Sequence, residues 1–392
     1  MAPAWPPGVA VAATSRLLLL ALLLGWSLGL RSAILPADRA DALYHAYDGG
    51  GVQINGPSIL VRKSIGTSVS AAYNYYVDNV TSASVDVLSY ASPYTEQRTE
   101  QSVSIDYLRG KSTLSLSYTN SDESDYVSDT YSFTISQDLF GDLTTVALGY
   151  SFSDNTVGRN NKNTGTTRIV GQARLQAWRL NISQILTRNS ILGFSFDTIS
   201  DEGYLNNPYR SVRYIDATSP IGFSYQPEVY PNTRTSNAGA LRLRYYLPWR
   251  GAVHGGYRLF SDTWGIRART WELGYVQTWR ERWTFELSYR LYDQSKADFY
   301  SDLFPYQDAQ NFLARDKELS TYTSRNLGFG ITYHFLKGGW GFIEDGSANF
   351  FYDMINFEYE DFRNIPAGGP PGQEPLYTFD AGVIRAFLSI WY

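Results

Sequence analysis

The residues best suited to acid–base chemistry in this 392-residue chain are its three histidines, His45, His254 and His334. Hydrolysis would need one of them beside a carboxylate or a serine. They lie in separate segments, and no serine or carboxylate stands at a spacing that marks a catalytic triad. The chain has no cysteine, which excludes disulfides, thiolate metal sites, thiol catalysis and covalently attached c-type haem. We therefore predict no enzyme activity and no catalytic, cofactor-binding or metal-binding residues, with a hydrolase as the alternative that the histidines leave open.

A second group of ionisable residues alternates with apolar ones. Successive side chains of a strand point to opposite faces, so if the apolar face meets lipid, the ionisable one lines an interior. These predicted lumen-lining residues are Asp106, Arg242, Arg244, His254, Arg258, Glu272, Glu286, Arg290 and Arg385. They could simply hydrate the interior and brace the wall. The functional alternative is that the arginines between residues 237 and 293 oppose carboxylates across a constriction and select solutes by charge.

About 16 β-strands between residues 41 and 392 would position these side chains. Residues 112–121, for example, carry Leu114, Leu116 and Tyr118 on one face and polar residues on the other. Only the strand at 172–186 changes parity, which predicts a bulge near Trp178. We expect a single-domain, all-β, transmembrane antiparallel up-and-down β-barrel, with 14 or 18 strands as the nearest variants. A soluble all-β sandwich or propeller is the alternative fold.

The connections between these strands alternate in length. Turns of two to four residues follow one strand, and longer polar connections follow the next, at 79–97, 155–167, 200–236, 294–320 and 360–375. Outer-membrane barrels have short periplasmic turns and long external loops, which is the same asymmetry. The connection 200–236 is long enough to fold into the mouth, where we favour plugging over ligand binding.

The last stretch, residues 382–392, ends on an aromatic residue preceded by apolar residues at alternate positions. Leu388, Ile390 and Tyr392 resemble the C-terminal signal by which barrel-assembly machinery recognises its clients. A terminal strand in lipid cannot keep an unpaired edge, so an earlier strand must close onto it. We predict that residues 41–48 pair with this last strand and that Arg385 faces inward.

Composition agrees with a barrel. The 31 Tyr and 10 Trp suit aromatic belts at two membrane surfaces. A mean hydropathy of -0.28 excludes a helical multispan protein, and the net charge of -5 gives no sign of nucleic-acid binding. The apolar run 17–30 is too short for a comfortable membrane helix, so we predict a signal peptide within residues 1–37, with an uncertain cleavage site. An uncleaved membrane anchor is the alternative.

Several motifs resemble the family of predicted outer-membrane proteins known as domain of unknown function 3570. They are residues 47–51 (YDGGG), 75–78 (YYVD) with 81–84 (TSAS), 123–126 (ESDY) and 201–210. The resemblance implies a barrel in a Gram-negative envelope. It assigns no activity and no functional residue, and it points only faintly to envelope redox work, in which a chain without cysteine would be a passage or a scaffold.

The sequence therefore predicts a bacterial outer-membrane barrel that acts as a porin-like channel or translocation pore of undefined substrate. The first alternative is a non-conducting structural or assembly barrel that serves as a scaffold for envelope partners, redox proteins among them. The second alternative is an outer-membrane hydrolase. The expected partners are outer-membrane lipid and lipopolysaccharide, the barrel-assembly machinery and periplasmic proteins, and the oligomeric state is left open.

Overall fold

The structure is a computed structural model that describes residues 34–85, 94–161 and 164–392. The predicted signal peptide lies outside the described residues, apart from 34–37. Sixteen antiparallel strands close into one barrel, which confirms the predicted transmembrane up-and-down fold and its strand number. Two more strands, β10 (Ser211–Ile215) and β11 (Phe223–Pro227), form a separate hairpin. Among the described residues, no helix is long and apolar enough to cross a membrane.

The barrel strands follow one another along the chain, and the short 3-10 helices lie in connections. The strands are β1 (Arg39–Gly49), β2 (Val52–Ile65), β3 (Val69–Ser82), β4 (Tyr94–Arg109), β5 (Ser112–Asp122), β6 (Tyr126–Leu139), β7 (Thr144–Asn161), β8 (Thr166–Thr187), β9 (Ser190–Gly203), β12 (Thr233–Tyr246), β13 (Gly251–Asp262), β14 (Arg267–Trp279), β15 (Trp283–Gln294), β16 (Tyr322–His334), β17 (Asp345–Arg363) and β18 (Leu376–Trp391), and the helices are η2 (Lys317–Leu319) and η3 (Ile365–Ala367).

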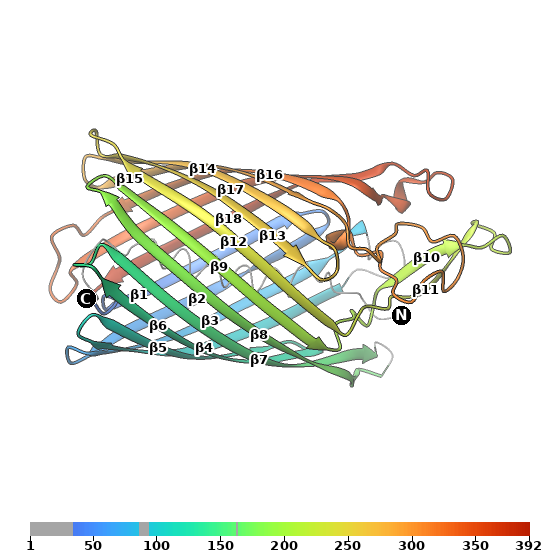
Figure 1. Ribbon diagram of the computed structural model, residues 1–392, viewed down its shortest axis with the longest axis horizontal. Helices are drawn as coiled ribbons and strands as arrows, with labels where there is room; N and C mark the ends of the chain where they lie inside the picture. The colour runs from blue at the N-terminus through green and yellow to red at the C-terminus, as the bar shows by residue number, and fades with distance from the viewer. Residues whose placement is uncertain (1–33, 86–93, 162–163) are drawn as a thin grey trace.

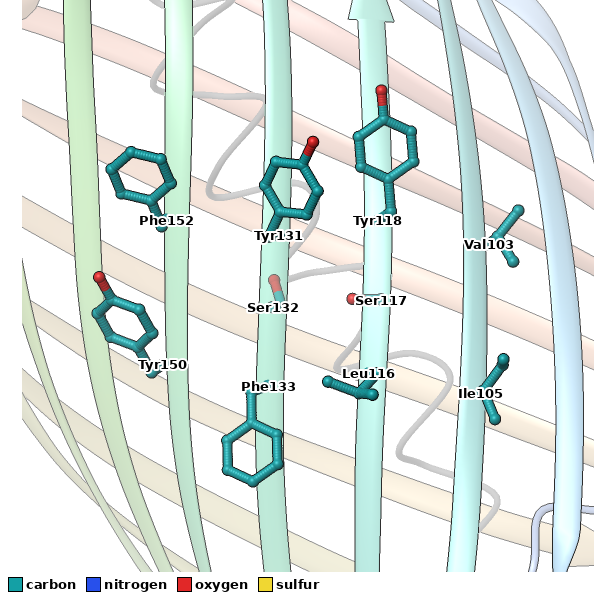
Figure 2. Close-up of a pocket in the computed structure, with 10 residues that line it drawn as sticks. All are labelled: Val103, Ile105, Leu116, Ser117, Tyr118, Tyr131, Ser132, Phe133, Tyr150 and Phe152. Carbon is teal, nitrogen blue, oxygen red and sulfur yellow. The ribbon is translucent and has the colours of Figure 1, made fainter.

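The outward face of the barrel is apolar and aromatic. Figure 2 shows part of it on β4–β7, where the hydroxyls of Tyr118, Tyr131 and Tyr150 point toward the same end of the strands, as expected of phenols that reach from an apolar band toward water. On β14, the exposed Trp271 and Trp279 lie eight residues apart. At ~3.3 Å per residue and a tilt of about 40°, they bound a band roughly 20 Å high. This band matches the hydrocarbon-facing girdle of a membrane barrel.

The first and last strands close the barrel. β1 pairs with β18 from Arg39 opposite Trp391 to Gly49 opposite Ala381, which confirms the predicted pairing. The neighbours of Arg385 on the outward face, Ile384 and Leu388, are exposed, and Arg385 itself donates to Asp353 at 2.7 Å. Arg385 therefore faces inward, as predicted.

The two ends of the barrel differ (Figure 1). We call the end with the tight turns and the C-terminus the short-turn end, and the other the loop end. One predicted loop, 155–167, is wrong, because β7 continues to Asn161 and β8 begins at Thr166. The pairing of these strands survives a register shift beside Gly158, whose amide donates to the carbonyl of Asp125 at 2.6 Å. Arg159, Asn161 and Thr166 are exposed on these extended strands, whereas Asn155 is buried.

The bulge predicted near Trp178 is also wrong. Trp178 pairs with Tyr150 on one side and Thr198 on the other without interruption, and the register of β8 shifts instead near its two ends. Leu175 and Ala177 have inward parity, and Ala177 is only 2% exposed. β8 carries apolar residues on both faces around Trp178, because its inward Ala177 is buried. This pattern resembles a change of parity in the sequence.

A packed layer, which we call the cap, covers part of the loop end. It comprises residues 204–232, 295–320 and 364–375, and its β10–β11 hairpin projects beyond the barrel strands (Figure 1). Its aromatic core joins Tyr230 and Phe299 of the cap to Trp264 and to the inward-facing Tyr359 and Tyr377 of the wall. The connection 200–236, which was predicted to fold into the mouth, therefore does so only in part. Its Tyr230 end packs against the inner wall, while its hairpin lies outside.

Candidate functional site

The inner wall carries its long side chains over glycines. A Cβ atom added to Gly274 would lie 2.1 Å from Cε1 of His254, and one added to Gly330 would lie 2.4 Å from the ring of Phe351. A Cβ on Gly328 would similarly lie 2.6 Å from a carboxylate oxygen of Asp353. The absence of side chains on these glycines lets His254, Phe351 and Asp353 lie close against the wall.

Seven of the nine predicted lumen-lining residues come together on β12–β15. The pairing register places Arg242, Gly256, Glu272 and Arg290 in one row across four strands. The other members lie in the adjoining rows. Toward the loop end lies Arg258, and toward the short-turn end lie first Arg244 with His254 and then Glu286.

The remaining two predicted residues, Asp106 and Arg385, lie elsewhere and are paired. Asp106 is buried on β4, where it accepts from Arg62 and from the Ser115 hydroxyl at 2.5 Å. Arg385 on β18 is bound to Asp353. These two residues brace the wall, as the simpler interpretation holds.

The carboxylates that were predicted to oppose the arginines lie mostly on the same wall. Glu272 and Glu286 share β14 and β15 with the arginine rows. By strand order, the wall across the barrel is β2–β5, where the only predicted carboxylate is Asp106, already bound by Arg62. Other inward positions there carry amides and hydroxyls, such as Asn74, Ser102 and Ser117. Two further inward carboxylates of this wall, Asp78 and Glu100, are bound by His45 and Arg98. The opposition of arginines and carboxylates across a constriction stays a prediction.

Sequence reasoning missed the surroundings of His45. Its Nε2 lies 2.7 Å from the Asp78 carboxylate and 3.0 Å from the Tyr76 hydroxyl, and its ring stacks on that of Tyr76 with centroids 4.8 Å apart. These residues are 33 and 31 positions apart in sequence and meet because Gly56 of the intervening strand has no side chain. The signal that sequence reasoning could have used is Gly56, an inward glycine on the strand that separates the inward residues His45 and Asp78.

This His45–Asp78 pair does not form a triad. The other ring nitrogen, Nδ1, is buried and has no hydrogen-bond partner among the described residues. No serine hydroxyl is therefore positioned for activation by His45. Within the described ranges there is also no group of three or more His, Cys, Asp or Glu residues arranged to hold a metal ion.

The cap contains a buried ionic network that ties its three segments together. Arg213 of β10 is fully buried and bridges Asp302 and Glu374, which belong to the other two segments. Arg315 adds a second contact to Asp302 at 2.9 Å. Burial raises the pKa of Glu374, but the hydrogen bond and the charge of Arg213 and the hydrogen bonds from backbone amides together hold that pKa below its usual value.

A second buried carboxylate of the cap behaves in the opposite way. Burial raises the pKa of Glu228 to about 7, although the charge of Arg210 favours ionisation. Its carboxylate accepts from the hydroxyl of Tyr230 at 2.7 Å and from the Arg315 amide at 2.7 Å. The cap thus combines an anchored ion pair with a carboxyl group that titrates near neutrality.

Solved structures similar to this chain are outer-membrane barrels. A bacterial polysaccharide outer membrane secretin matches with 7% identity and a TM-score of 0.50, over 91% of this chain and 99% of its own. The siderophore receptor PirA from Pseudomonas aeruginosa matches with 12% identity and a TM-score of 0.41, over 83% of this chain. The FrpB iron transporter from Neisseria meningitidis matches with 10% identity and a TM-score of 0.42, over 91% of this chain. The chain spans 60% of the length of either of the latter two.

At such identities only the fold is shared. No curated protein sequence matches the chain. The family described as protein of unknown function DUF3570 matches residues 53–342, which is most of the barrel. The chain therefore belongs to the DUF3570 family, as its motifs indicated.

Proposed function

We propose that this barrel is a porin-like channel or translocation pore of the bacterial outer membrane. The observation that carries the proposal is the inner wall, where the polar side chains of His254 and Asp353 lie over Gly274 and Gly328. A barrel of about 16 strands is wide enough for an aqueous interior, in which such charges stay hydrated. Side chains that lie close against the wall leave that interior available for a polar solute.

In this proposal the short-turn end faces the periplasm and the loop end faces the outside. That orientation follows the usual arrangement of outer-membrane barrels and puts the cap at the external mouth. The outward belt contacts membrane lipid and lipopolysaccharide. The barrel-assembly machinery recognises the C-terminal strand through Leu388, Ile390 and Tyr392.

Planar bilayers test the proposal. The full chain is compared with a variant in which residues 204–232 are replaced by a short Gly-Ser linker, so that the cap loses its hairpin and Tyr230. The pore interpretation predicts single-channel conductance that is larger in the linker variant. Absence of conductance from both proteins, with their barrels shown to be folded by circular dichroism, contradicts it.

The cap supports a second candidate, a non-conducting barrel that serves as a scaffold for envelope partners. Its aromatic core and its buried network around Arg213 make a rigid surface at the loop end. This candidate predicts that the linker variant also fails to conduct and that it loses partners captured by cross-linking to the hairpin. Conductance of the linker variant alone would assign the hairpin and Tyr230 the role of a closure.

A further inference from the structure

Three arginines of the inner wall, Arg242, Arg258 and Arg290, form no ion pair within the part of the chain that the structure describes. Other inward arginines do: Arg62 contacts Asp106, and Arg385 contacts Asp353. A guanidinium group carries five N–H donors and stays charged at any physiological pH. These three residues, which we call the arginine triangle, therefore keep donors that no protein carboxylate satisfies.

The triangle surrounds a patch of small residues. Arg242 and Arg290 share a row, with Gly256 between them, and Arg258 lies one row toward the loop end. Three strand spacings of ~4.8 Å place the Cα atoms of Arg242 and Arg290 roughly 14 Å apart. The like charges of both act on Arg258, together with the opposite charge of Asp197 on β9.

Small side chains flank the triangle on the wall. The neighbours of the triangle in the pairing register are Gly193 beside Arg242 and Ala240 and Thr270 on either side of Arg258. Aromatic rings support two of the guanidinium groups, since Arg258 lies 5.8 Å from the ring centre of Phe260 and Arg290 lies 5.8 Å from that of Tyr292. The three guanidinium groups therefore border one patch of small side chains, which we call the shelf. Ala240 and Thr270 in this shelf are buried beside Arg258, whereas Arg290 is exposed.

The local charge is positive. Two carboxylates lie near the shelf. Glu272 faces Arg290 in the register but forms no ion pair with it among the described residues. The charge of Asp197 acts on Arg258 and Arg242, but Asp197 is paired with Arg179 at 3.6 Å, and that pair adds no net charge. Three arginines and one glutamate give 3 - 1 = +2 at the shelf. Planar guanidinium forks match the two oxygens of a carboxylate or a phosphate.

We propose that the arginine triangle binds the oxyanion group of a solute, a phosphate or a carboxylate, as that solute passes along the inner wall. The inference rests on the proposed pore function only for the route by which the solute arrives. Binding itself needs the triangle and an accessible interior.

Isothermal titration of the full chain in detergent tests the binding, with inorganic pyrophosphate and citrate as separate probes. We expect each of Arg242→Gln, Arg258→Gln and Arg290→Gln to weaken binding about tenfold, because each removes a charge-assisted contact. Glu272→Gln should tighten binding, because it removes the competing carboxylate. The matched control is Arg269→Gln, which removes an arginine from the exposed outward face of β14 and should change affinity less than twofold.

The two probes identify the preferred oxyanion, since a phosphate site favours pyrophosphate and a carboxylate site favours citrate. Equal weakening by Arg269→Gln and by the triangle variants, or no binding of either probe, overturns the triangle. Reversal potentials in a KCl gradient then test the pore separately, with the triple variant expected to lose anion preference. Binding without conductance would contradict the proposed pore function but support oxyanion binding by the triangle. Conductance without binding would support the pore function and contradict oxyanion binding.

Discussion

Replacing Arg213 by methionine should open the cap while leaving the barrel closed. The Arg213 side chain is fully buried between Asp302 and Glu374, which are 10% and 2% exposed. Methionine fills much of the same volume but leaves Glu374 buried without its cation. Asp302 keeps Arg315 at 2.9 Å, so the loss falls mainly on the contact between the hairpin and residues 364–375.

The size of the effect follows from burial. Removing one partner of a buried ion pair costs about 3–5 kcal/mol, because the other charge stays desolvated. At ~1.4 kcal/mol per tenfold, the open population of the cap should rise by about two to three and a half orders of magnitude. Among the described residues, the Arg213 side chain donates hydrogen bonds to Asp302 and Glu374 of the cap and to no residue of a barrel strand.

Limited chymotrypsin digestion in detergent measures this opening. Cleavage after the buried Phe223 and Tyr230 requires the cap to unfold locally, and its rate follows the open population when reclosing is fast. The matched control is Arg325→Met. The Arg325–Glu358 pair is 52% and 48% exposed on the outward face, so its loss should cost at most about 1 kcal/mol. A cleavage rate within about threefold of the unmodified chain for Arg213→Met would refute the claim that the buried network holds the cap.

The remaining predictions concern pH, wall packing and assembly. Because burial raises the pKa of Glu228 to about 7, the folded cap favours the protonated carboxyl. The contribution of Glu228 to the stability of the cap is therefore full below the usual pKa of about 4.5 and is lost as pH rises through 7. Hydrogen exchange of the cap, corrected for intrinsic rates, should accelerate across that window, and Glu228→Gln should flatten the change; an identical slope in the variant would contradict this. Gly274→Val should destabilise the barrel by about 1–3 kcal/mol, because the new side chain collides with His254. Adding His254→Ala should restore the folded fraction in urea titrations, and a Gly274→Val variant as stable as the unmodified chain would contradict the collision. Leu388→Ser should reduce membrane assembly more than Leu327→Ser, which changes a similarly exposed outward leucine far from the C-terminus, and equal losses would argue against a C-terminal signal.

The barrel could be predicted from the sequence because alternation is a local property. Each outward leucine or tyrosine specifies the parity of its own strand, and parity with alternating turn lengths specifies strand number, closure and the inward position of Arg385. The errors arose where the polarity of a residue no longer indicates whether it lies inside or outside the membrane band. Beyond the band bounded by Trp271, both faces of a strand are polar, so the tip of the β7–β8 hairpin was mistaken for a loop.

The inner surface was harder to predict because its partners are set by register between strands. Sequence named the arginines correctly as a group on neighbouring strands, but it could not tell that Asp106 is neutralised by Arg62 or that Glu272 shares the arginine wall. Nor could it place His45 beside Asp78 across the whole of β2. These relations depend on pairings between residues far apart in sequence, which no periodicity within one segment contains.

The pairing of β1 with β18 has a consequence for how the chain can fold. Its partners, from Arg39 with Trp391 to Gly49 with Ala381, come from opposite ends of the described sequence, whereas every other barrel pairing joins strands that are consecutive within the barrel. Neighbouring strands can therefore pair one after another. The pairing of β1 with β18 has the largest loop-closure entropy to overcome and cannot start before the final strand is made. Until then an open sheet in lipid exposes two unsatisfied edges. Closure should thus be the late, rate-limiting step of insertion, and a catalyst that shields both edges would accelerate it most.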